Sequence, residues 1–201
     1  MSFRLLGAVC LAASLFGGTI ASAQVATMGM GEAAADTATR TCVGILSQEV
    51  AFPEALAEQQ KLLESYGLSV GLPQAAFDES GPFRALYSRA TLAHRQVGSD
   101  AFALALGGAQ PTCRLIPYRV GDRTTAKALL AKSLLSPGLG WKEAPARQTN
   151  PAVERRMFVK RSAGGKAMLL NLISGQDAAN GQPILVTVAV IPAGVQLPEG
   201  F

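Results

Sequence analysis

Two cysteines place the strongest single constraint on the fold of this chain, because they lie in segments of different predicted structure. From Asp36 onward the apolar residues recur with helical spacing, and Cys42 belongs to that stripe. Cys113 lies in PTCRLIPYRV (residues 111–120), where apolar and polar positions alternate as in a strand. A bond between the two would hold a helix against a sheet. The helical stripe consists of Cys42, Ile45, Leu46 and Val50.

The N-terminal sequence predicts that these cysteines meet in an oxidising compartment. One positive charge precedes a short apolar run, and Ala-Ser-Ala at 21–23 follows as a small-residue cleavage site. This pattern indicates a signal peptide (residues 1–23) cleaved after Ala23, and no charged stop follows that would favour an uncleaved anchor. The third cysteine, Cys10, falls inside the leader. We therefore expect a periplasmic or secreted protein with a Cys42–Cys113 disulfide.

The cysteines do not predict a metal or redox site. Zinc needs about four ligands, whereas the chain offers one histidine and two separated cysteines outside the leader. A thiol–disulfide active site would need a C-x-x-C pair, which the sequence lacks. We expect no metal ion and no cofactor.

The order of the predicted elements indicates an α+β domain. Two helices precede two or three strands, a third helix begins at Asp122, and three strands follow. The short turns between the strands favour an antiparallel sheet. We expect five to six strands with about three helices packed on one face. The predicted boundaries are a flexible N-terminal arm (24–35), an α+β domain (36–192) and an irregular C-terminal tail (193–201).

Composition argues against two classes of partner. The formal net charge is only +4 over 201 residues, which is below what we expect of a nucleic-acid-binding domain. The most apolar stretch after the leader, PILVTVAVIP (183–192), has eight residues between its prolines. Because a spanning helix needs about 20 apolar residues, we expect no transmembrane segment in the mature chain.

Catalytic motifs are few. His94, in LAHRQ, is the only histidine, and the sequence has neither a G-x-S-x-G elbow nor an S-x-x-K pair. The segment SAGGKAM (162–168) has Ala167 where a phosphate loop needs Ser or Thr, so we interpret it as a hairpin turn. If the protein is an enzyme, we expect a small envelope hydrolase that uses His94 as its general base. This is the alternative to a non-catalytic binding function.

A basic stretch from Arg147 to Lys166 is the most distinctive feature, with six cations against one acid, Glu154. Within the predicted strand VERRMFVKR (153–161), alternate residues share a face. One face then carries an aromatic ring between two cations, and we expect it to be open. The residues of that face are Arg156, Phe158 and Lys160, whereas Arg155 and Arg161 lie on the other.

Such a strand face could bind an anionic envelope component, for example a lipid head group or a cell-wall carboxylate, or an acidic protein. Its alternative role is to keep a sheet edge soluble. Trp141, in GLGWKEAP, is either a contact residue or a plug over the core. The candidate binding residues are Arg155, Arg156, Phe158, Lys160, Arg161 and Trp141.

A third hypothesis is a carrier of an apolar ligand between the sheet and the helices. It rests on the apolar segments MLLNLIS and ILVTVAVI, which an ordinary packed core explains as well.

The cysteine placement resembles that of a group of small exported Gram-negative bacterial proteins of unknown function. The likeness covers about Thr41 to Leu135 and consists of TC in an early helix, PTCRLIPY after an apolar strand, and a following helix with leucine pairs. The resemblance implies export and the disulfide, and it supplies no active site. The leading prediction is an exported, non-catalytic binding or accessory protein of the cell envelope.

Overall fold

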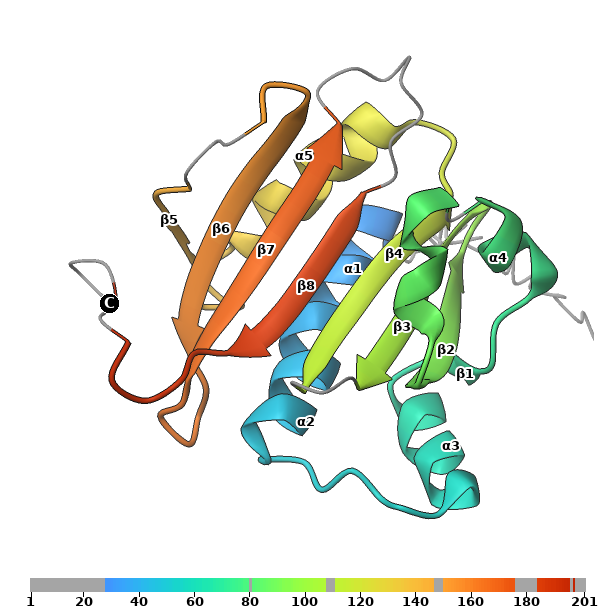
Figure 1. Ribbon diagram of the computed structural model, residues 1–201, viewed down its shortest axis with the longest axis horizontal. Coiled ribbons are helices and arrows are strands. Elements are labelled where there is room, and N and C mark those ends of the chain that lie inside the picture. Colours follow the sequence, from blue (N-terminus) through green and yellow to red (C-terminus); the bar gives the residue numbers. More distant parts are fainter. Residues whose placement is uncertain are drawn as a thin grey trace, which may run out of the picture.

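The computed structural model describes residues 28–79, 81–107, 111–146, 150–175, 184–195 and 197, and the predicted signal peptide lies outside them. The described chain is an α+β structure with one antiparallel sheet of eight strands (Figure 1). The predicted class and strand orientation are confirmed. The predicted count of five to six strands is wrong, because two short edge strands of two and three residues extend the sheet.

The sheet consists of two meanders that join in its centre. Its strand order is β1-β2-β3-β4-β8-β7-β6-β5, so the last strand in the chain pairs with β4 from the first meander. Helix α5 (Arg123–Leu134) connects the two meanders. The strands are β1 (Ser69–Val70), β2 (Ala90–Val97), β3 (Asp100–Gly107), β4 (Thr112–Arg119), β5 (Lys142–Ala144), β6 (Val153–Arg161), β7 (Ala167–Gly175) and β8 (Leu185–Val190).

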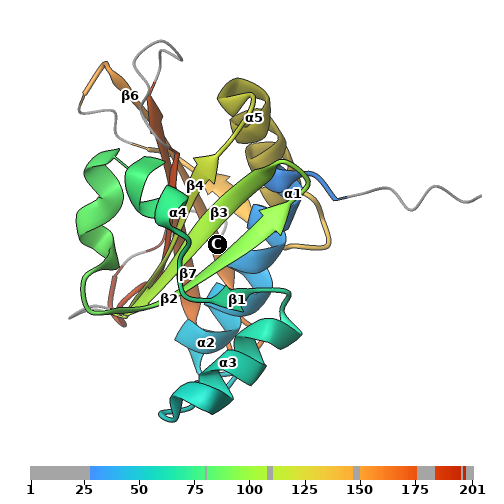
Figure 2. The same cartoon turned by 90° about the vertical axis from the view of Figure 1, so that its right-hand side faces the viewer.

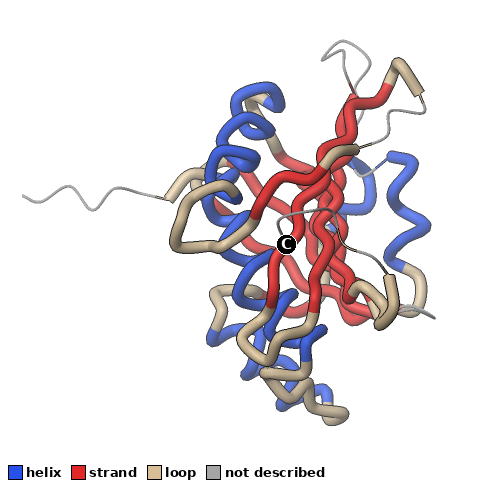
Figure 3. Tube along the Cα trace, turned by 90° about the vertical axis from the view of Figure 1, so that its left-hand side faces the viewer, coloured by secondary structure: helices blue, strands red, loops and turns tan. Residues whose placement is uncertain are grey.

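A helical rod and α5 cover one face of the sheet (Figures 1 and 3). The rod runs without a break through α1 (Met30–Thr37), a π-helical turn (Ala38–Cys42) and α2 (Val43–Ser47). It begins inside the segment predicted as a flexible arm (24–35), so that prediction is wrong for residues 30–35, while residues 24–27 lie outside the described residues. The small residues of this segment allow α1 to lie close against α5, and its three consecutive alanines, 33–35, are fully buried.

Other helical segments cover the first meander on the opposite face, which corrects the prediction that the helices share one face. These are α4 (Gln74–Glu79) and a 3₁₀ segment (Gly81–Tyr87), which lie across the sheet from α1 and α5 (Figure 2). They enclose a second apolar core over β3 and β4. Helix α3 (Leu56–Ser65) lies beside β1 at the end of the sheet.

The predicted disulfide is present. Cys42, the last residue of the π-helical turn, is bonded to Cys113 of β4, with 5.5 Å between their Cα atoms. Both residues are fully buried. The bond therefore ties the helical rod to a central strand. Among the described residues, no helix has the length and apolar character that crossing a membrane requires.

Candidate functional site

Strand β6, which carries most of the basic stretch, lies second from one edge of the sheet, between β5 and β7. Its residues alternate between the two faces as predicted. Phe158 pairs in register with Leu170 of β7, and both belong to the core under α1 and α5. On the opposite face, no described helix covers β6 to β8 (Figure 1).

The face with Arg156 and Phe158 was predicted to be open, and this is wrong. Phe158 is 0% exposed. The Nε and Nη2 atoms of Arg156 donate to the two carboxylate oxygens of Glu143 in β5, each at 2.7 Å. These hydrogen bonds hold the pKa of Glu143 below its ordinary value and raise the pKa of Arg156. Arg156 and Glu143 therefore link β6 to β5.

Trp141 is a core residue, as in the plug alternative. It is 4% exposed, and its Nε1 donates to Thr39 Oγ1 at 2.8 Å. Lys160 lies over its ring, with Nζ 5.6 Å from the ring centroid, and donates to the main-chain oxygen of Leu139 at 2.8 Å. Burial lowers the pKa of Lys160, and the carboxylate of Glu49 partly opposes this shift.

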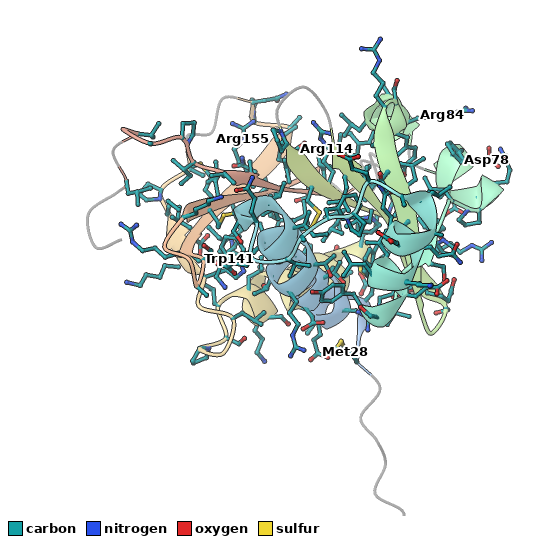
Figure 4. All side chains as sticks on the ribbon, turned by 90° about the horizontal axis from the view of Figure 1, so that it is seen from below. Met28, Asp78, Arg84, Arg114, Trp141 and Arg155 are labelled. Atoms are coloured by element: carbon teal, nitrogen blue, oxygen red, sulfur yellow. A yellow bond between two sulfur atoms is a disulfide. The ribbon has the colours of Figure 1, made fainter. Side chains whose placement is uncertain are left out.

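Arg155 and Arg161 belong to the face without helices. Arg155 pairs in register with Ile173 of β7. Figure 4 shows Arg155 and Arg114 on the side of the sheet away from α1, while Trp141 lies on the side of α1. Between these two arginines, the register places Thr187 and Asn171 side by side on β8 and β7.

Arg161, the last residue of β6, lies between two open cavities. The first has a volume of about 290 Å³ and is bounded by Gly140, Val159 and three cationic residues. The second has about 440 Å³ and lies between the β6–β7 hairpin and residues 190–195. All charged residues that line the two cavities, within the part of the chain that the structure describes, are cations, and we call them the basic cluster. Its members are Lys142, Lys160, Arg161 and Lys166.

The hairpin that carries half of the basic cluster is attached to the end of the helical rod. The main-chain N–H of Gly164 donates to Glu49 Oε1 at 2.6 Å, and Lys166 Nζ donates to Gln48 Oε1 at 3.0 Å. The first of these bonds lowers the pKa of the Glu49 carboxyl. The α2 end thus fixes where Arg161 and Lys166 lie.

His94 has no catalytic partner among the described residues. Its Nδ1 lies 3.0 Å from the main-chain oxygen of Gly71, and within the described ranges no carboxylate or hydroxyl side chain bonds to the ring. His94 lines neither cavity at Arg161. In the same part of the chain, no group of three or more His, Cys, Asp or Glu residues could hold a metal ion.

No protein-family model, curated protein or solved structure matches this chain. Sequence reasoning named Lys160 and Arg161 as binding residues and did not include Lys142 or Lys166. Lys166 falls inside the basic stretch, whereas Lys142 joins the cluster only because β5 pairs with β6, where Lys142 faces Val159.

Proposed function

We propose that this protein is an exported, non-catalytic binding protein of the cell envelope, and that the basic cluster binds an anionic partner. One observation carries the proposal: among the described residues, the two cavities that meet at Arg161 are lined by four cations and by no acidic residue. Side chains of one sign in an open cleft create a positive potential that attracts anions. The buried disulfide supports export, because such bonds persist in oxidising compartments.

The chemistry of the cavity walls defines the partner. Arg161 presents a planar guanidinium, which suits carboxylate and phosphate groups, and Lys142 and Lys166 add compact ammonium groups. Val159, Val190 and Ile191 supply apolar contact beside these charges. A polymer or protein that carries carboxylates or phosphates fits this site better than a neutral one, and salt should weaken its binding.

Neutralising Arg161 and Lys166, two members of the cluster, should weaken this binding. We expect Arg161→Gln with Lys166→Gln to bind fractionated cell envelope at least tenfold more weakly than the wild type at low salt. The reason is the loss of two of the four cations at the cavity mouths. The measurement is capture of each purified protein on immobilised envelope fractions at low and moderate salt.

A matched control removes the same charge elsewhere. Lys61 and Lys132 are exposed on α3 and α5, outside both cavities. Lys61→Gln with Lys132→Gln should bind like the wild type. Equal weakening by both double variants would show that binding depends on net charge and not on the basic cluster. Binding that moderate salt leaves unchanged would rule out the proposed anionic partner.

A further inference from the structure

A third cavity lies where α2 meets the ends of β2 and β3. Its volume is about 380 Å³, which is within the range of sites for small molecules. Most of its described lining is apolar, and the apolar side chains come from the helical rod, the segment after it, the end of β3 and the residue before β4. They are Ile45, Leu46, Phe52, Leu106 and Pro111.

Strained backbone gathers at this cavity. Gln48 (φ +66°) and Arg89 (φ +58°) are the two non-glycine residues with positive φ in the described part of the chain, and both line it. A left-handed conformation costs free energy for residues with a side chain, and such residues cluster at ligand sites. Gly107, also in the lining, lies close against the main chain of Arg89. A Cβ atom at Gly107 would lie 3.2 Å from the Arg89 carbonyl oxygen.

Among the described residues that line the cavity, Arg89 supplies the only charge. Its side chain is exposed, and within the described residues it makes no hydrogen bond or ion pair. The two other polar side chains of the described lining each make a hydrogen bond: Gln48 Oε1 accepts from Lys166 Nζ, and Thr91 Oγ1 donates to Gln59 Oε1. The cavity therefore combines apolar walls with one guanidinium that has no partner there.

The disulfide holds two walls of this cavity in place. Cys42 precedes Ile45 and Leu46 by about one helical turn, and Cys113 pairs in register with Leu106 of β3. Because these apolar walls are already fixed, little conformational entropy is lost in ordering them when a ligand binds.

We infer that this cavity binds a small amphipathic carboxylate of the fatty-acid type. The apolar chain lies against Ile45, Leu46 and Phe52, and the carboxylate pairs with Arg89, whose guanidinium can bind both of its oxygens. The ligand class follows from the combination of an apolar lining with a single cation. This inference uses a site distinct from the basic cluster and does not depend on the function proposed above.

Isothermal titration calorimetry with three probes that each carry a ten-carbon chain tests the assignment on protein purified after expression of the complete sequence. Decanoate should bind, decanol should bind more weakly, and decyltrimethylammonium should not bind measurably. Arg89→Gln should weaken decanoate binding at least tenfold and change decanol binding less than twofold. The control Arg84→Gln, which removes an exposed arginine outside the lining, should leave both affinities unchanged.

Two further variants separate ligand binding from folding. Arg89→Gly removes the charge and relieves the left-handed strain, so it should weaken decanoate binding while the melting temperature stays equal or rises. Leu46→Trp fills the cavity and should abolish binding of both decanoate and decanol. The inference is overturned if wild-type protein does not bind millimolar decanoate, if Arg89→Gln binds it as tightly as the wild type, or if the cationic probe binds equally well.

Discussion

Cys42→Ala combined with Cys113→Ala should lower the free energy of unfolding by about 4 kcal/mol, because the bond closes a long loop in the unfolded chain. The two cysteines are 71 residues apart in the sequence. In a chain of this size a loss of about 4 kcal/mol corresponds to a melting temperature lower by roughly 10 °C. Urea denaturation of the double variant and the wild type measures the difference directly.

Thiol titration gives the control for this prediction. Wild-type protein unfolded without reductant should expose no reactive thiol from Cys42 or Cys113, and reduced protein should expose both. Either single variant, Cys42→Ala or Cys113→Ala, also breaks the bond and should lose about as much stability as the double variant. A double variant within about 1 kcal/mol of the wild type would contradict the stabilising role that we assign to the bond.

Gly31→Ala should destabilise the protein by about 3 kcal/mol, although alanine is the better helix former. A Cβ atom at this position would lie 2.6 Å from the main-chain nitrogen of Leu130 and 2.9 Å from the main-chain oxygen of Ala126. These are backbone atoms of α5, so the two helices would have to separate to make room. Helix propensity alone would favour alanine by about 1 kcal/mol, and the sign of the change therefore distinguishes the two effects.

Gly29→Ala is the matched control. Gly29 precedes α1, its φ is −70°, and a Cβ there would have no neighbour within 4 Å. We expect its free energy of unfolding, measured by urea denaturation, to stay within about 0.5 kcal/mol of the wild type. If Gly31→Ala proves as stable as Gly29→Ala, α1 does not pack on α5 as closely as the structure shows.

Elements with strong local signals could be predicted from the sequence. Helix α5 begins where expected, because Asp122 Oδ1 accepts from the main-chain N–H groups of Thr124 and Thr125. Helix α1 was missed because its buried face consists largely of alanine, which gives no contrast of large apolar against polar residues. What buries that face is its contact with α5, about a hundred residues later in the chain, and no local pattern reports such a contact.

The candidate site shows the same division. Alternation along β6 could be predicted, since it follows from strand geometry. The face of β6 that the helices cover could not be predicted, because both of its faces carry cations. The partners that occupy Arg156 and Lys160 are Glu143 and the carbonyl of Leu139, which reach β6 from the preceding segment of the chain. These two contacts depend on tertiary structure, which the local sequence pattern does not report.

The central position of β8 has a consequence for how the chain is assembled. Because β8 lies between β4 and β7, both of these strands keep an unpaired edge until residues 185–190 are available. Cys42 and Cys113 both precede them, so the covalent link can form in a molecule whose sheet is still split in two. Open strand edges promote association between chains. In a chain that stops before β8, the disulfide could still form, but β4 and β7 would both keep an open edge, and such a chain would be prone to aggregate.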